Sequence, residues 1–84
     1  MSRKLDKIDL ELRKKVAIRI RQLREASGKN QTQFAYHYGK DKQTQNKLEI
    51  GRGATIYSIH KFCKALGINL SDFFDSPLFD KQKK

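Results

Sequence analysis

The chain lacks the many cysteines of disulfide-rich proteins and the long apolar runs of membrane-spanning proteins. Its 84 residues include one cysteine, one proline, five glycines and no tryptophan. A single cysteine excludes an internal disulfide, which fits a reducing compartment. No apolar run approaches the length of a membrane span, and the N-terminal residues alternate charged and aliphatic side chains instead of forming a signal core. We therefore expect a soluble, cytoplasmic protein that enters no membrane.

Acidic residues are scarce relative to basic ones. The chain has 19 Lys and Arg residues against nine Asp and Glu residues, which gives a net charge of +10 and a pI near 10.0. Such an excess of one sign favours a polyanionic partner, either a nucleic acid or an anionic membrane surface. A chain of 84 residues forms one domain with one small hydrophobic core.

No pattern of side chains typical of catalysis or of metal binding can be recognised either. His60 and Cys63 form an H-x-x-C pair, but two ligands do not make a zinc site, and we expect Cys63 to be a small core residue. The sequence offers no Ser-His-Asp or Cys-His-Asn set and no glycine-rich phosphate loop. We therefore expect no enzymatic activity, no cofactor, no metal and no small-molecule substrate.

The spacing of apolar residues predicts a long first helix. They recur every three or four residues, as one face of a helix requires, at Leu5, Ile8, Leu12, Val16, Ile20 and Leu23. Asp6 or Asp9 supplies its N-cap, and Ser27 with Gly28 ends it. Capping and stop signals predict four shorter helices. The first begins at Gln31, the second spans about Lys42 to Glu49, the third spans Ile56 to Leu66, and the fourth begins after Ser71. No strand pattern, repeat or long linker interrupts this all-α chain.

Residues 31–50 predict a sharp corner between two of these helices. Ala35 is small enough for the helices to approach closely, Gly39 can adopt a positive φ in the turn, and Asp41 can cap the second helix. This combination is typical of a helix-turn-helix. The second helix carries side chains of the kind that contact base edges and phosphates in a DNA major groove, namely Lys42, Gln43, Thr44, Asn46 and Lys47.

From Ile20 to Phe74 the chain resembles the Cro/repressor-type helix-turn-helix family, also called XRE-like. The resemblance rests on IRQLREASG, Gln31, Phe34-Ala35, Gly39, Leu48-Glu49, Gly51 and the closing KALGINLSDFF. It implies an all-α, five-helix lambda-repressor-like DNA-binding domain over residues 20–74, with the helix-turn-helix at 31–50. Residues 1–19 then form a basic N-terminal extension of the first helix, and residues 75–84 form a C-terminal tail.

The resemblance also implies a function and a set of contacts. A small transcriptional regulator would bind double-stranded DNA sequence-specifically as a homodimer, with half-sites about 34 Å apart. The base-edge candidates are the five polar residues of the recognition helix. Phosphate contacts are implied for Gln31 at the start of the preceding helix, for Lys40 in the turn and for Arg52 in the following loop. Arg24 and Glu49 are implied to form a partly buried ion pair between the first helix and the recognition helix.

The chain departs from the family pattern at Lys40 and Gln45, which stand where apolar residues are usual. Six polar residues, 42–47, therefore run in a row, with only Leu48 to anchor the helix. Two interpretations stay open. Either Gln45 finds hydrogen-bond partners inside the protein, or the recognition helix is tilted or mobile until DNA orders it.

The apolar stripe of the first helix is longer than the family domain can cover. Leu5, Ile8 and Leu12 are left over, and they can pack against Leu78 and Phe79 of the tail or against a second chain. Together with the polar residues at 40 and 45, this stripe leaves a protein-interaction module as an alternative function. RNA binding by the same basic fold is a further alternative.

Overall fold

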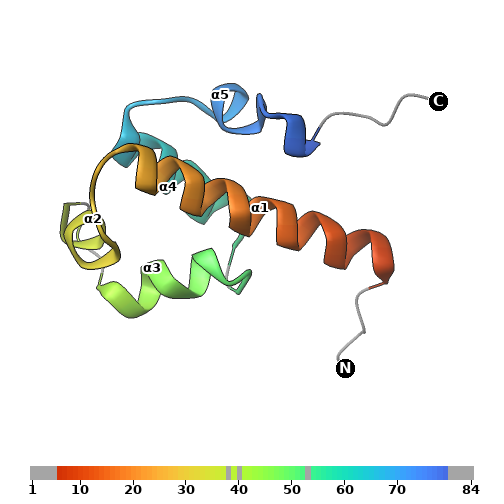
Figure 1. Cartoon of the computed structure of the whole chain (residues 1–84), viewed down its shortest axis with the longest axis horizontal. Helices are drawn as coiled ribbons and strands as arrows, with labels where there is room; N and C mark the ends of the chain where they lie inside the picture. Colours follow the sequence, from red (N-terminus) through yellow and green to blue (C-terminus); the bar gives the residue numbers. More distant parts are fainter. Residues whose placement is uncertain (1–5, 38, 40, 53, 80–84) are drawn as a thin grey trace.

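The computed structural model describes residues 6–37, 39, 41–52 and 54–79. These residues form five α-helices and one short 3-10 helix, and they contain no strand (Figure 1). The elements in order are α1 (Lys7–Ala26), α2 (Gln31–His37), α3 (Lys42–Glu49), α4 (Ile56–Leu66), α5 (Leu70–Phe74) and η1 (Pro77–Phe79). The predicted all-α fold is confirmed. Among the described helices, none combines the length and apolar character that crossing a membrane requires.

Helix α1 is the longest element, and its two ends follow the local sequence. Asp6 is the N-cap, and its side chain accepts a hydrogen bond of 3.0 Å from the backbone N–H of Asp9. The helix ends at Ala26, and Gly28 takes the positive φ of 81° that the following turn requires. In Figure 1 the N-terminal half of α1 extends beyond α3 and α4.

The core forms where all five α-helices meet, and α3 contributes Leu48 to it. Four of its side chains are almost fully buried, namely Ile20, Phe34, Phe62 and Phe73. The ring centroids of Phe34 and Phe62 lie 5.1 Å apart, and those of Phe62 and Phe73 lie 6.2 Å apart. Burial of each such side chain stabilises the fold by about 1.5–3 kcal/mol, so these contacts fix the positions of the short helices.

The predicted corner between α2 and α3 is present, and the two helices pack against each other. Ala35 is fully buried, and Gly39 has a φ of 76°. Asp41 caps α3 by accepting a hydrogen bond of 2.9 Å from the backbone N–H of Thr44. Tyr38 and Lys40 lie outside the described residues.

The predicted start of the last α-helix is wrong by two residues. Helix α5 begins at Leu70, because Asn69 and not Ser71 is in the cap position. The side chain of Asn69 accepts from the backbone N–H of Asp72, and the carboxylate of Asp72 accepts from the backbone N–H of Asn69, which completes a capping box.

Within the segment predicted as a C-terminal tail, residues 77–79 form η1, which packs against α1. The ring of Phe79 lies 5.0 Å from that of Phe74, measured between centroids. Arg19 of α1 donates to the carbonyl oxygens of Phe73 at 2.7 Å and Asp72 at 2.9 Å, and so satisfies the C-terminal end of α5. The segment 80–84 lies outside the described residues.

Candidate nucleic-acid interface

An ion pair attaches the C-terminal end of α3 to α1. Arg24 of α1 donates from Nε to Glu49 Oε2 at 2.6 Å and from Nη2 to Glu49 Oε1 at 3.1 Å. The side chains of Arg24 and Glu49 are only 10% and 3% exposed. The remaining nitrogen, Nη1, donates to the carbonyl oxygen of Lys29 at 2.8 Å. The pair implied by the family resemblance is therefore present, and Arg24 also fixes the loop between α1 and α2.

Glu49 accepts hydrogen bonds from two further side chains. Gln45, one turn earlier in α3, donates from Nε2 to Oε2 at 2.7 Å, and Gln31 of α2 donates from Nε2 to Oε1 at 3.0 Å. Gln45 is completely buried. Of the two interpretations of its polar character, the structure favours the first, in which Gln45 has a partner inside the protein. A polar network centred on Glu49 joins α1, α2 and α3.

The network keeps Glu49 ionised. Burial by itself raises the pKa of this carboxyl, but the hydrogen bonds from Arg24, Gln45 and Gln31, with the charge of Arg24, outweigh burial and lower the pKa below 4.5. The hydrogen bond to Glu49 correspondingly raises the pKa of Arg24, against an opposing effect of burial. Both partners are therefore charged at neutral pH, which is the condition for a short bidentate pair.

The face of α3 opposite this network is exposed and polar. Gln45 and Leu48 are buried, whereas the five predicted base-edge residues, Lys42, Gln43, Thr44, Asn46 and Lys47, are all exposed. At about 100° per residue, positions 45, 48 and 49 share one side of the helix and Gln43 and Lys47 lie on the opposite side. Thr44 and Asn46 lie on the flanks, and Lys42 lies near the network side in the first turn. Hence α3 presents donors, acceptors and two ammonium groups outward on a backbone that the Glu49 network fixes.

Gln31, for which a phosphate contact is predicted, also contacts the exposed side of α3. Besides its bond to Glu49, its Nε2 donates to Asn46 Oδ1 at 3.1 Å, so it orients one of the exposed side chains of α3. A polar hollow of about 290 Å³ lies beside it and is lined by Arg24, Asn30, Gln31, Thr32 and Lys42. The hollow brings Gln31 and Lys42, two predicted contact residues from different helices, to one place. The sequence does not reveal the link from Gln31 to Asn46, because it spans 15 residues.

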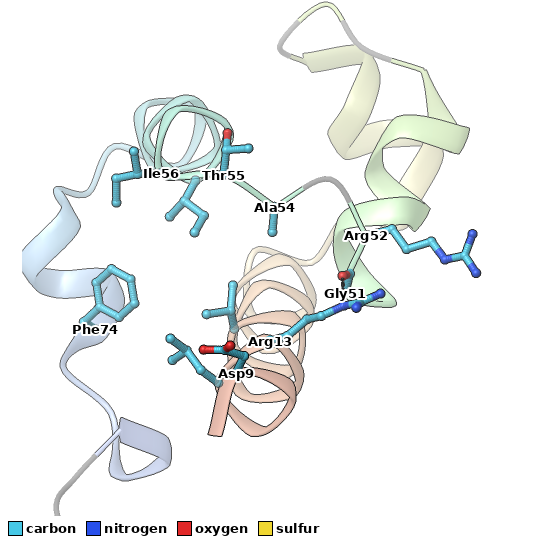
Figure 2. A pocket seen from close by; sticks show the side chains of 11 residues that line it. Asp9, Arg13, Gly51, Arg52, Ala54, Thr55, Ile56 and Phe74 are labelled. Atoms are coloured by element: carbon cyan, nitrogen blue, oxygen red, sulfur yellow. Dashed lines mark hydrogen bonds between the residues drawn. The ribbon is translucent and has the colours of Figure 1, made fainter. Parts of the chain in front are cut away.

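The loop after α3 is fixed by a residue that the sequence does not single out. Arg13 of α1 donates from Nε to the carbonyl oxygen of Gly51 at 2.6 Å. Gly51 has a φ of 89°, and a Cβ atom there would lie 3.3 Å from Arg13 Cγ. Figure 2 shows Arg13 reaching from α1 to Gly51. The exposed side chain of Arg52 points away from the pocket drawn there, which lies between α1, α4 and α5. Arg52 is thus placed at the end of α3, where its backbone N–H donates to the Lys47 carbonyl oxygen at 2.7 Å.

Other residues considered for chemistry are not assembled into a site. Among the residues that the structure describes, no three His, Cys, Asp or Glu side chains are grouped as metal ligands. Cys63 is a buried core residue, as predicted, and burial raises the pKa of its thiol. A thiol in this setting is protonated and unreactive.

The polar face of α3, the Glu49 network behind it and Arg52 at its end together form the candidate interface. Its geometry suits recognition of an extended polyanion, because an ordered helix projects neutral and cationic groups without an exposed acidic residue between Lys42 and Lys47. Comparisons with models of protein families, with curated proteins and with solved structures give no match for this chain.

Proposed function

We propose that the chain binds double-stranded DNA sequence-specifically, as a small transcriptional regulator of the lambda-repressor-like type. In this proposal α2 and α3 form the helix-turn-helix, and α3 enters the major groove. One observation carries the proposal: α3 exposes five polar side chains, two of them lysines, while a buried network fixes its opposite side. The resemblance of residues 20–74 to Cro/repressor-type proteins and the net charge of +10 support it.

The proposed contacts divide into those that read bases and those that hold phosphates. Gln43 and Lys47 lie one turn apart on the exposed side of α3, and their side chains pair best with adenine and guanine respectively. Asn46 is oriented by Gln31 and would read a base beside them. Gln31, Arg52 and the undescribed Lys40 would hold phosphates, which positions α3 without selecting a sequence. Lys42 and Thr44 stay base-edge candidates beside Gln43.

The alternative of a protein-interaction module loses part of its basis in the structure. It drew on the polar character of Lys40 and Gln45 and on the spare apolar stripe of the first helix. Since Gln45 donates to Glu49 inside the protein, its polarity needs no external partner. RNA binding relies on the same basic charge as DNA binding, so the experiment below separates the two.

The test measures binding of the full chain by fluorescence anisotropy. The ligands are a duplex enriched by selection from random DNA, a scrambled duplex of equal composition, and a structured RNA of equal length. Gln43→Ala and Lys47→Ala should each reduce the preference for the enriched duplex by about tenfold or more, because one good base contact gives about 1–3 kcal/mol of discrimination.

Lys61→Ala and Lys64→Ala are the matched controls, because both lysines are exposed on α4. They should leave the preference for the enriched duplex unchanged. Equal binding of RNA and both duplexes, or an equal loss of preference in the α4 variants, would show that α3 does not read DNA.

A further inference from the structure

The N-terminal half of α1 carries aliphatic side chains that the fold leaves uncovered. Ile8 is 75% exposed and Leu12 is 51% exposed, although η1 packs against the same helix. Leu12 lines a groove of about 990 Å³, whose apolar lining also includes Val16, Ile56, Ile59 and Phe74 (Figure 2). Exposed aliphatic residues gathered at one groove are characteristic of an interaction surface. The η1 helix therefore does not account for the spare stripe of the first helix.

Charges on the two flanks of Leu12 indicate what covers this surface. At about 100° per residue, Asp9 and Arg13 lie on one flank of Leu12, and Glu11 and Lys15 lie on the other. Each flank thus carries an acid before Leu12 and a base after it. On the first flank the acid stands three residues before Leu12 and the base one residue after it, and on the second flank the acid stands one residue before Leu12 and the base three residues after it.

This pattern is self-complementary in one orientation only. Consider an antiparallel pair of α1 helices related by a two-fold axis at Leu12. The flank with Asp9 and Arg13 then faces the identical flank of the other helix, which runs in the opposite direction, and the same holds for the flank with Glu11 and Lys15. Asp9 then lies near Arg13 of the second copy, and Glu11 lies near Lys15 of the second copy. In a parallel pair each flank would meet the opposite flank at equal height, which places acid beside acid and base beside base.

We infer that two copies of this chain associate through antiparallel α1 helices centred on Leu12. In this arrangement Leu12 packs against Leu12 of the second copy, and Ile8 enters the groove of the second copy near Val16. Arg13 is already held at the rim by its 2.6 Å bond to the Gly51 carbonyl oxygen, so its pairing costs little further side-chain entropy. The inference does not depend on DNA binding: a chain that dimerises in this way and binds no DNA refutes only the proposed function.

The test is the dissociation constant of the full-length dimer, measured by sedimentation equilibrium without DNA. Leu12→Lys, which buries two ammonium groups at the centre, should weaken the dimer by at least about a hundredfold. Ile18→Lys is the matched control, because Ile18 is an exposed aliphatic residue of α1 that lies outside the groove, and it should change the constant by less than about threefold.

A charge reversal tests the orientation without disturbing the core. Glu11→Lys and Lys15→Glu should each weaken the dimer by about tenfold, since each creates two like-charge contacts per dimer, and the double variant should restore it. Circular dichroism melting confirms that every variant is folded. A monomeric wild-type chain at high micromolar concentration, an unchanged dimer in Leu12→Lys, or additive weakening in the double charge variant would each overturn the inference.

Discussion

Replacement of Glu49 by glutamine removes the charge that Arg24 faces while it preserves the shape of the side chain. Arg24 would keep its bond to the Lys29 carbonyl oxygen but lose its bidentate partner, and the one remaining amide oxygen would be shared among Arg24, Gln45 and Gln31. Both charged side chains are at most 10% exposed. Removing one partner of such a buried pair lowers the free energy of unfolding by about 3–5 kcal/mol.

The measurement is urea unfolding at pH 7, followed by circular dichroism. For a domain of this size, a loss of about 3 kcal/mol corresponds to a fall of about 12–24 °C in the melting temperature. Glu25→Gln is the control, because the side chain of Glu25, whose ion pairs with Arg21 and with Arg24 Nη2 measure 3.1 Å and 3.9 Å, is more than half exposed. That variant should cost about 0.3–0.5 kcal/mol. If Glu49→Gln costs no more than Glu25→Gln, the network does not hold α3 and the reasoning fails.

The same variant has a pH signature. The pKa of Glu49 is lower in the folded protein than in the unfolded chain, so its contribution to stability is complete above pH 4.5 and is lost as pH falls through the folded value. Wild-type stability should therefore fall in acid more steeply than that of Glu49→Gln. The difference between the two proteins should be largest at neutral pH, and parallel curves from pH 7 to pH 3 would contradict a lowered pKa for Glu49.

Three further predictions concern the residues around α3. Gln45→Ile should lower the free energy of unfolding by more than about 1 kcal/mol in urea titrations, because it removes a donor to the buried carboxylate of Glu49, and a more stable variant would contradict this. Gly51→Ala should cost about 1–3 kcal/mol by the same assay, given the φ of 89° and the contact with Arg13 Cγ, whereas Gly28→Ala has the strained φ without that contact and should cost less. Arg52→Ala should weaken binding to all duplexes alike and reduce the slope of log K against log salt by about 1, and an altered sequence preference would assign Arg52 to base reading instead.

Local signals in the sequence predict most of the helix bounds, because caps act over three or four residues. Asp41 caps α3 as expected, and of the two candidates Asp6 and Asp9 it is Asp6 that caps α1. The error at α5 arose where two candidate caps stand close together, although the Asn69 and Asp72 spacing of a capping box was readable. The 3-10 helix η1 gave no signal, because three residues are too few to show a period.

The supporting contacts of the candidate interface were less predictable. The pairing of Arg24 with Glu49 followed from the resemblance, whereas the bonds from Gln31 and Gln45 to the same carboxylate depend on how α2 and α3 pack. The bond from Arg13 to Gly51 spans 38 residues, and no local pattern marks either end. Exposure of the α3 side chains was predictable, because a run of polar residues on a short helix leaves only one side to bury.

The most direct test of the central claim is a pair of parallel selections from random duplex DNA, one with the wild-type chain and one with Gln43→Ala. If α3 reads bases in the major groove, the wild-type chain enriches one sequence, and the variant relaxes or changes the preference at one base pair while it retains the others. Failure of the wild-type chain to enrich any sequence, or enrichment of an identical sequence by both proteins, would contradict the claim.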